Sequence, residues 1–583
     1  MAVQFIFGGS GRGKTYFLQH KIMEEAVKNL KKDYIMIVPE QFTMQTQKDM
    51  IRISPGHGIM NVDVQSFVRL AFRVFSETGA GNVQVLDDLG KIMILKKVLS
   101  NKKDDLKYFG RNINKDGYIS EIKSFMSELI QYGADENEIE KMIQASENKT
   151  VLKYKLQDMS VAFSAFKEYI DKNYITSEEL LSVFADVISQ SGLLKGAVIC
   201  LDGFTGFTPL QYRLLRELIK IAEKVYITVT ADERESVINK GKNYQLFFMS
   251  RKTVNNIRLI ASETGVEVLD DIWTGKEISQ TRFGSSKELE WLERNLFRYP
   301  YKRYNNGKEC EVSDISCHVL KYAEDEIDFV VQKIKRLLVN EGCRYRDIAI
   351  VAGSLETYGN IIEHAMKKAG IACFIDQKRG VQSSVLVRAI DALLQIIIKD
   401  FSYEDIMDYL KGCLSWTSDS KNDILDNYLL ATGIRGFKAW NREWNTSYAY
   451  RRMTDESKEF ANGIVENVRL SVIENLSEFY EKVAKGKHTV RDYATALVEF
   501  FERQHFYEKL MELADDYEEN ENFDVASEYR QLYDMVIEVL EKLVSIMGDE
   551  EMLLKEFKDI LDVGFSEARI GVIPPGIDQV MAG

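Results

Sequence analysis

The sequence predicts an α/β protein with two α/β cores, each interrupted by a large helical insertion. Short apolar runs typical of buried strands alternate with helical patterns near the start of the chain and again from about residue 310. Between and after these regions, apolar residues recur three and four positions apart, as in amphipathic helices. A length of 583 residues is also too great for a single hydrophobic core.

The first core is predicted from residues 1–85 together with 191–285, and the first helical insertion from residues 86–190. A buried strand at 3–7 is followed by a glycine-rich loop and by a helix from about Lys14 to Leu30. Further buried strands are expected at 34–38, 197–201 and 225–230.

The second core is predicted from residues 286–400 and 563–583, and the second helical insertion from 401–562. Its expected strands are 315–320, 347–351 and 371–375, with strand-like residues again at 570–573. Its expected helices are 324–339 and 354–369. Because an apolar stretch at 577–581 directly precedes Gly583, we expect the chain to stop within this domain, which is then truncated.

Bulk properties favour a cytoplasmic protein that is not inserted in a membrane. No apolar run approaches the ~20 residues that cross a bilayer, and the first residues lack the features of a signal peptide. The six cysteines are scattered without a CxxC pair, as expected for reduced thiols. The net charge of −14 decides little, because DNA motors can be acidic overall and basic only along a channel.

A phosphate-binding loop is predicted between the first strand and the first helix. Its residues fit the pattern G-x-x-x-x-G-K-[ST], in which glycines turn backbone N–H groups toward phosphate oxygens. In this pattern Lys14 reaches the terminal phosphates of ATP and the Thr15 hydroxyl binds Mg²⁺. The interpretation requires room for a triphosphate beside the loop. The eight residues are Gly8, Gly9, Ser10, Gly11, Arg12, Gly13, Lys14 and Thr15.

A second part of the nucleotide site is predicted at Asp202, which ends the buried strand 197–201. Its carboxylate is placed to hold Mg²⁺, directly or through water. Hydrolysing helicases usually follow this aspartate with a glutamate that orients the attacking water, but here Gly203 follows. We therefore expect ATP binding with little turnover; the alternative role for Asp202 is to cap a turn.

Five further stretches resemble the AddB (RexB) family. The segment LDGFTGFTP resembles the family's D-G-F-x-x-F-T-P signature, and VPEQFT resembles V-P-[DE]-Q-x-T. SFVRLA, YRDIAI and IPPGIDQV resemble S-F-x-R-L-A, Y-[RK]-D-[IV]-A and I-P-P-x-[LI]-D-Q-V. With the phosphate loop, these matches run from residue 8 to residue 580 in family order. The five stretches lie, in the order given, at 201–209, 38–43, 66–71, 345–350 and 573–580.

The resemblance implies a superfamily 1 helicase-like fold with two RecA-like P-loop cores. It implies a heterodimer with an AddA-type subunit that carries the main motor, acting on single-stranded and broken double-stranded DNA. It implies a contribution to reading the recombination hotspot sequence Chi. The family's nuclease domain and iron–sulfur cluster are expected only beyond Gly583, so neither activity is assigned to these residues.

DNA contacts are predicted where segments follow the second strand and the next helix begins. Amide, hydroxyl and guanidinium groups of Gln41, Thr43 and Arg69 suit phosphates and base edges. Aromatic rings stack on unpaired bases. The family pattern often has Trp where this chain has Phe72, so the Chi sequence it reads is expected to differ. The aromatic candidates, for each of which burial in the core is the alternative, are Phe67, Phe72, Phe204 and Phe207.

Two other classes of protein stay open from the residues alone. One is a stand-alone P-loop ATPase or kinase unrelated to DNA, against which the second α/β core and the two insertions argue. The other is a scaffold whose phosphate loop no longer binds nucleotide. A zinc site at Cys310, Cys317 and His318 is not expected, because the spacing is too loose and no second pair lies nearby.

Overall fold

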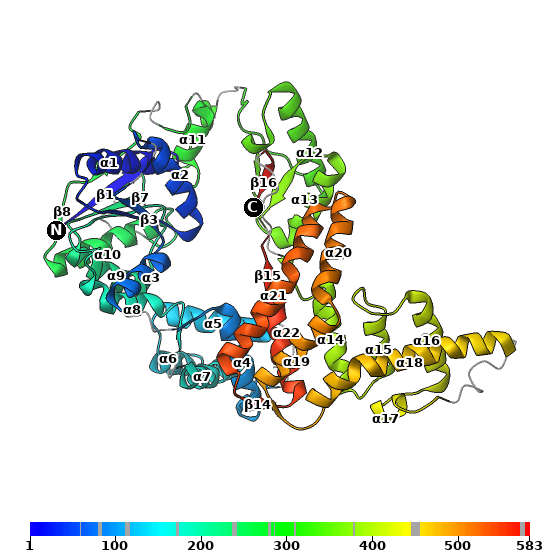
Figure 1. The fold of residues 1–583 in the computed structure, drawn as a ribbon. Helices are drawn as coiled ribbons and strands as arrows, with labels where there is room; N and C mark the ends of the chain where they lie inside the picture. The colour runs from blue at the N-terminus through cyan, green and yellow to red at the C-terminus, as the bar shows by residue number, and fades with distance from the viewer. Residues whose placement is uncertain are drawn as a thin grey trace. The chain divides into compact units, whose positions relative to one another are not determined.

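The computed structural model divides into two compact units. It describes residues 1–56, 58, 60–79, 84–110, 117–170, 174–235, 242–277, 281–284, 286–307, 311–376, 379–444, 455–571 and 578–583. Unit 1 comprises Met1–Asp87 and Ser124–His318, and unit 2 comprises Asp88–Lys123 and Val319–Gly583. Figure 1 shows the helices and strands of each unit.

Unit 1 is built on a seven-stranded parallel sheet with the order β3-β2-β6-β7-β1-β8, in which β9 pairs with the far end of β1. Parallel strands place all their carboxyl ends at one edge of a sheet. The strands are β1 (Ala2–Gly8), β2 (Tyr34–Ile37), β3 (Val62–Gln65), β6 (Val198–Leu201), β7 (Lys224–Thr230), β8 (Glu267–Val268) and β9 (Ile272–Trp273).

Helices cover both faces of this sheet, so its strands are apolar on both sides. Phe5 and Phe7 of β1 enter the core on one face, and Ile6 enters the core on the other. Figure 1 shows the helices on either side of the strands. The Ile6 face packs on α1 (Lys14–Lys28) and α2 (Thr43–Ile53), and the other face on α3 (Phe67–Thr78), α8 (Leu180–Val187), α9 (Pro209–Ile221) and α10 (Phe248–Thr264).

The rest of unit 1 is mainly helical. Helix α6 (Glu136–Ala145) packs on α7 (Thr150–Ile170), and β4 (Gln84–Leu86) pairs with β5 (Tyr174–Thr176). Helix α11 (Lys287–Asn295) follows the sheet in sequence, and the division between the two units falls within α5 (Tyr118–Gln131).

Unit 2 combines a small parallel sheet with many helices. Its three strands have the order β10-β16-β11, and α12 and α13 pack together on the same apolar core. The strand β16 comes from the last residues of the chain yet lies between the other two. These elements are β10 (Ala349–Ile350), β11 (Cys373–Ile375), β16 (Val580–Ala582), α12 (Ala323–Asn340) and α13 (Leu355–Ala369).

The remaining helices of unit 2 pack on one another, for example α4 on α22 and α20 on α21. Two short antiparallel pairs, β12 (Arg379–Gly380) with β15 (Arg569–Ile570) and β13 (His488–Thr489) with β14 (Glu551–Met552), join distant segments. The helices are α4 (Asp88–Asn101), α14 (Val385–Ile398), α15 (Tyr403–Leu410), α16 (Asp419–Thr432), α17 (Phe437–Trp440), α18 (Asp455–Val483), α19 (Val490–Arg503), α20 (Phe506–Glu519), α21 (Phe523–Met547) and α22 (Leu554–Glu567).

The predicted α/β class is confirmed, with three corrections in detail. The segment 315–320, predicted as a strand, is irregular, and Val319 is 95% exposed because no neighbouring strand of the described chain covers it. The strand-like residues near 570 form β15, which pairs antiparallel with β12 outside the parallel sheet, while 572–577 lie outside the described residues. Strand β3 was not predicted, because its four residues give too little pattern, yet pairing with β2 stabilises it.

The segment predicted as a single helical insertion at 86–190 is divided between the units. Residues 88–123 group with unit 2, where α4 packs on α21 and α22. Helices α6 and α7 stay with unit 1. In the described residues, no helix combines the length and apolar character needed to span a membrane.

Candidate functional site

The loop predicted to bind phosphate joins β1 to α1. Gly11 and Gly13 adopt positive φ angles of 70° and 76°, which residues with a Cβ atom disfavour. Gly13 directly precedes α1, and no side chain of a described residue caps that end of the helix. The first backbone N–H groups of α1 therefore lie beside the loop, as in anion-binding helix N-termini.

The structure brings Lys14, Thr15 and Asp202 together at the carboxyl edge of the sheet. The Thr15 hydroxyl donates to Asp202 Oδ1 at 3.2 Å, although the two residues are 187 positions apart. The hydroxyl of Thr228, on β7, donates to the same oxygen at 2.6 Å. Asp202 is only 5% exposed, so these bonds hold a buried carboxylate in a fixed orientation.

Lys14 has an unusual electrostatic environment. Its Nζ donates to the carbonyl oxygen of Gly9 at 2.8 Å. Burial lowers the pKa of Lys14 to about 8, although the charges of Asp202 and Glu293 act in the opposite direction. Near neutral pH the side chain is therefore protonated but loses its charge under mildly alkaline conditions.

Residues just after β9, Thr274 and Gly275, and helix α11 lie directly against the loop. A Cβ atom on Gly8 would come within 2.6 Å of Thr274 Oγ1, and one on Gly9 within 2.3 Å of Glu293 Oε1. In this arrangement neither glycine has room for a Cβ atom unless the Thr274 hydroxyl or the Glu293 carboxylate shifts.

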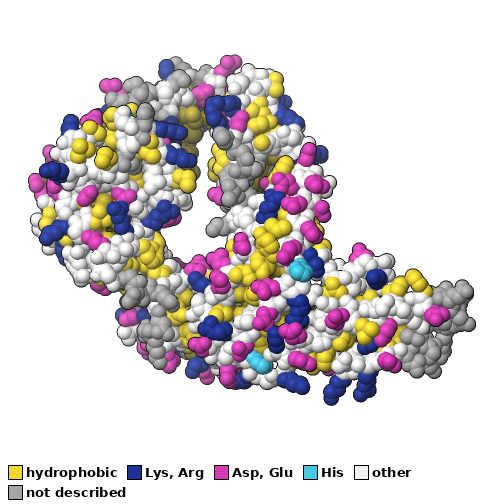
Figure 2. Space-filling view, in the orientation of Figure 1, with side chains coloured by type: hydrophobic (Ala, Val, Ile, Leu, Met, Phe, Trp, Pro, Cys, Tyr) yellow, Lys and Arg dark blue, Asp and Glu magenta, His cyan; other side chains and the backbone are white. Residues whose placement is uncertain are grey.

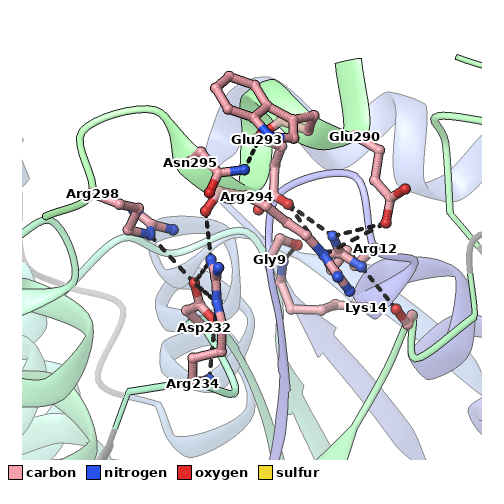
Figure 3. Close-up of polar contacts among 12 residues, drawn as sticks. Gly9, Arg12, Lys14, Asp232, Arg234, Glu290, Glu293, Arg294, Asn295 and Arg298 are labelled. Atoms are coloured by element: carbon pink, nitrogen blue, oxygen red, sulfur yellow. Dashed lines mark hydrogen bonds and ion pairs between the residues drawn. The ribbon is translucent and has the colours of Figure 1, made fainter. Parts of the chain in front are cut away.

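Arg12 carries the main contacts between the loop and α11. Its Nε and Nη2 donate to Glu293 Oε2 at 3.2 and 3.0 Å, and Nη1 donates to the Gly275 carbonyl at 3.0 Å. Glu290 lies 3.8 Å from the same guanidinium group, and Arg12 is only 8% exposed. Figure 3 shows Arg12 pointing toward both carboxylates. The loop is thus held to α11 by a largely buried ion-pair cluster.

The space on this side of the loop is small. The cavity bordered by Gly9, Arg12, Asp232 and Glu293 has a volume of about 20 Å³. A water molecule fits in such a space, but a triphosphate does not. On this side of the loop, a triphosphate could therefore enter only if Glu293 moved away from it.

The residues on the other side of the loop fit a nucleotide-bound cation. The Thr15 hydroxyl and the Asp202 carboxylate are the hard oxygen ligands that Mg²⁺ prefers, and Mg²⁺ in phosphate sites keeps few protein ligands. Thr15 is exposed, so this oxygen can be reached from solvent. No cluster of three or more histidine, cysteine, aspartate or glutamate residues suited to a metal occurs in the described residues.

Three predicted DNA-contact segments follow three adjacent strands of the sheet. Residues 38–44 follow β2, residues 66–72 follow β3, and residues 202–207 follow β6, which are neighbours in the order β3-β2-β6. At such an edge, open parallel sheets usually bind their ligands. Glu40, Gly203 and Thr205 are exposed in these segments, and so are the six residues here called the strand-edge patch: Gln41, Phe42, Met44, Val68, Arg69 and Phe72.

The four aromatic candidates divide into one core residue, two half-buried residues and one exposed residue. Phe67 is 5% exposed, with its ring centroid 5.4 Å from that of Phe204 and 6.4 Å from that of Phe207. For Phe67 the alternative interpretation as a core residue therefore holds in this structure. Phe72 is 48% exposed and lies edge-to-face with Phe75, so about half of this side chain is open to solvent.

The polar candidates also differ in how far they are exposed to solvent. The Thr43 side chain is buried and its hydroxyl donates to the Glu40 carbonyl at 2.9 Å, so this hydroxyl already has an internal partner. Gln41 is exposed. Arg69 Nε lies 2.8 Å from Glu40 Oε1, and its side chain is 58% exposed, so a phosphate would compete with Glu40 for it.

Sequence reasoning missed the partners of these residues. Glu293 lies 281 positions from Arg12. Like Glu290, it belongs to an ordinary amphipathic helix whose pattern gives no sign of a contact with the loop. Thr228 carried no signal either. Glu40 precedes Gln41 in one predicted contact segment, and Arg69 lies in the next. Their opposite charges were the one feature of the sequence that could have indicated a contact between them.

The chain is thus an α/β protein with a parallel sheet and a glycine-rich loop between its first strand and first helix. Residues 5–293, a range that ends within α11, match the family model described as "ADDB, N-terminal". The chain belongs to the AddB family.

Curated relatives named as the B subunit of an ATP-dependent helicase/deoxyribonuclease align with the whole chain. The proteins of Lachnoclostridium phytofermentans, Clostridium novyi and Acetivibrio thermocellus are 39%, 33% and 32% identical to it, over 589, 581 and 588 aligned residues. The alignments cover 100% of this chain and 50%, 49% and 50% of the three relatives. The chain thus spans about half the length of the curated relatives it matches.

The two helix-α3 phenylalanines give a matched test of these placements. Phe67→Ala removes a ring packed between Phe204 and Phe207, so we expect it to lower the free energy of unfolding by about 3–5 kcal/mol. Phe72→Ala removes a half-exposed ring and should change it by no more than about 0.5 kcal/mol. Urea unfolding followed by circular dichroism measures both. Equal losses for the two variants would contradict the assignment of Phe67 to the core.

Proposed function

We propose that this chain is the N-terminal part of the B subunit of a two-subunit, ATP-dependent helicase–deoxyribonuclease that processes broken double-stranded DNA for recombinational repair. Membership of the AddB family and the names of the relatives support this proposal. In this role the chain binds ATP–Mg²⁺ through the Gly8–Thr15 loop and Asp202, and grips single-stranded DNA at the strand-edge patch. The contact between Thr15 and Asp202 carries the nucleotide part of the proposal.

The proposed architecture and partner follow from the same family. The parallel sheets of unit 1 and unit 2 correspond to two RecA-like cores, and the helices of unit 2 to an insertion in the second. An AddA-type subunit is the motor partner, and residues of the strand-edge patch take part in reading Chi. Support comes from the position of the patch at the carboxyl edge of β2, β3 and β6, the same edge of the sheet as the nucleotide loop.

The nucleotide site acts in regulation or assembly rather than as the main motor. Gly203 follows Asp202 with a φ of 79°, and a Cβ there would lie 3.5 Å from Pro39. No carboxylate therefore stands at the position that orients the attacking water in hydrolysing relatives. Glu293 in addition competes with phosphate for Arg12.

We expect weak ATP turnover by the 583-residue chain alone. Phosphate release measured with and without forked DNA should stay below roughly 1 s⁻¹, the low end of the usual range for enzymes. A faster, DNA-stimulated rate would show that the chain is itself a motor.

The charge of Lys14 should make nucleotide binding depend on pH. An anionic ligand favours the protonated amine, whose pKa in the free protein is about 8. As pH rises through 8, the protonated fraction falls, so the affinity for Mg–ATP should fall about tenfold for each further pH unit. Calorimetric titration between about pH 7 and about pH 9.5 measures this. In Lys14→Arg the guanidinium stays protonated throughout, so that variant should show a flat profile, and a flat profile in the unsubstituted protein would refute the effect.

Removing the charge of Glu293 should strengthen nucleotide binding. Glu293→Gln keeps the size of the side chain but weakens its hold on Arg12, so less energy is spent in releasing the loop. Because hydrogen bonds to charged groups contribute about 1.5–3 kcal/mol, we expect Kd for Mg–ATP to fall about tenfold or more. Glu288→Gln is the matched control on the same helix, since Glu288 accepts from the backbone of Ser313 and Asp314 instead of contacting the loop. Equal affinities in the two variants would contradict this role for Glu293.

The strand-edge patch is tested by DNA binding. The triple variant Phe42→Ala, Arg69→Ala and Phe72→Ala should bind a labelled single-stranded oligonucleotide at least about tenfold more weakly, because base stacking contributes ~1–3 kcal/mol for each ring. Fluorescence anisotropy at several salt concentrations measures the affinity. If the unsubstituted chain shows no salt-dependent DNA binding at all, the alternative of a P-loop ATPase or kinase unrelated to DNA is favoured.

A further inference from the structure

A short segment that begins near the end of α11 combines aromatic and basic residues. Residues 294–304 have the sequence RNLFRYPYKRY and contain four Lys or Arg, four aromatic residues and no Asp or Glu, in a chain of net charge −14. On the face drawn in Figure 2, by contrast, Lys and Arg are interspersed with Asp and Glu over most of the surface. The composition of this segment is thus unlike that of the surrounding protein.

Three of the four aromatic side chains of this segment face solvent. Phe297 is 81% exposed, Tyr299 is 97% exposed and Tyr301 is 78% exposed. Burial of aromatic rings is strongly favourable, because each removes about 150–250 Å² from water. Three exposed rings within five residues therefore indicate a surface that is covered by another molecule.

Arg298 attaches the segment to the rest of unit 1. Arg298 Nε lies 3.3 Å from Asp232 Oδ2, and its guanidinium group lies 4.5 Å from the ring centroid of Phe247. Figure 3 shows Arg298 and Arg234 pointing at Asp232 from two sides. Burial opposes the charge of Asp232, but hydrogen bonds from Arg234 and the charge of Arg298 lower the pKa of Asp232 to about 2. Arg298 is thus an internal anchor and not a free cation.

A second anchor and a strained residue fix the display of the rings. The Tyr304 ring packs edge-on against Trp291 of α11, with the ring centroids 5.3 Å apart. Phe297 has a φ of 56°, a left-handed conformation that is unfavourable for a bulky side chain. Such strain persists only where surrounding contacts impose it, and it is common at binding sites. The anchors at Arg298 and Tyr304 therefore hold the exposed rings outward.

The two cations at the end of the segment are available to a ligand. Lys302 and Arg303 are exposed, and neither has an ion pair or a side-chain hydrogen bond with any residue that the structure describes. By comparison, Arg294 is paired with Glu290 at 3.5 Å. The segment thus presents three rings and two available positive charges on a fixed backbone.

We propose that Phe297–Arg303, here called the aromatic–basic segment, binds single-stranded DNA at a place separate from the strand-edge patch. The proposal rests on the proposed function, in which the chain holds unpaired DNA. Exposed rings stack on bases, and the two cations pair with backbone phosphates, which is the combination that non-sequence-specific strand binding uses. Every base has a face on which a ring can stack, so this segment contributes affinity for any strand and does not read the Chi sequence.

The chemistry favours a nucleic acid over a protein partner. A protein surface that paired with Lys302 and Arg303 would have to supply two acidic groups, whereas a strand supplies one negative charge per nucleotide. Pro300 and Lys302, beside Tyr299 and Tyr301, are exposed too, so the rings project singly and do not form the packed apolar centre typical of a protein interface. Failure of the variants below to alter DNA binding would leave a protein partner as the occupant.

Two sets of variants test the aromatic–basic segment in the full 583-residue chain. The first is Phe297→Ala, Tyr299→Ala and Tyr301→Ala, with Tyr132→Ala and Phe523→Ala as matched controls, since those two rings are 60% and 57% exposed elsewhere. The second is Lys302→Ala with Arg303→Ala, matched by Lys485→Ala with Lys487→Ala, which are also exposed. Binding of a fluorescein-labelled oligothymidylate is measured by anisotropy, and thermal unfolding checks that each variant is folded.

The two sets should have different signatures. The aromatic set should weaken binding by about 10- to 100-fold with an unchanged salt dependence, because stacking is not electrostatic. The cation set should weaken binding and lower the slope of log K against log salt by about 1.4, at ~0.7 for each phosphate that is no longer neutralised on a single strand. The control variants should bind as the unsubstituted chain does.

A direct readout does not depend on reduced affinity. Tyr299→Trp keeps a stacking ring, so its fluorescence should be quenched when the oligonucleotide is added. A Trp that stays in solvent and contacts no base would not be quenched. One outcome would refute the aromatic–basic segment as a strand-binding site and leave the proposed function intact. In that outcome the chain binds DNA and the strand-edge variants weaken binding, but both alanine sets bind with unchanged affinity and DNA does not change the fluorescence of Tyr299→Trp. If the unsubstituted chain does not bind the oligonucleotide at all, both proposals are overturned.

Discussion

The parallel pairing of the strands in unit 1 is the constraint on which the candidate site depends. Strands β1, β2, β3 and β6 run in the same direction, so the loops that follow them meet at one edge. Asp202 and Thr15, which are 187 residues apart, meet there only because β6 and β1 both flank β7. Thr228 of β7 lies between them and holds the carboxylate in place. A change of register in this sheet would separate the three oxygens whatever their chemistry.

Helix α11 connects the nucleotide loop to the aromatic–basic segment. Glu293 near its end contacts Arg12, and the chain reaches Phe297 only four residues later. Since Arg12 is largely buried, taking away its carboxylate partners without a replacement is unfavourable by several kcal/mol. A phosphate that replaces Glu293 satisfies Arg12 and at the same time removes an attachment of α11. If the loop binds nucleotide as proposed, its occupancy would therefore act on the helix that leads into the segment proposed to bind DNA.

The sequence predicted those parts of the site that depend on local pattern: the phosphate loop, its flanking strand and helix, and the acidic residue after β6. Contacts between distant segments, such as Arg12 with Glu293, leave no trace in local periodicity, so the covering of the loop by α11 was not predicted. Residues 315–320 alternate as a strand does, but a strand forms only where a neighbour completes its hydrogen bonds, and no described segment does so here. Phe67 and Phe72 look alike in the sequence, and only packing against rings from another loop decides which is core.

Overall charge is a poor guide to whether this chain binds DNA. Electrostatic interactions at physiological salt are screened over about 8 Å, so a strand near the aromatic–basic segment responds to its local charge and not to the total of −14. Residues 294–304 carry four positive residues and no negative ones. Because acidic and basic side chains are interspersed over the face shown in Figure 2, that face has no broad basic area to attract DNA over a long range. DNA binding, as proposed, would then depend on short-range stacking and on a few well-placed cations, which is the arrangement that three exposed rings beside Lys302 and Arg303 provide.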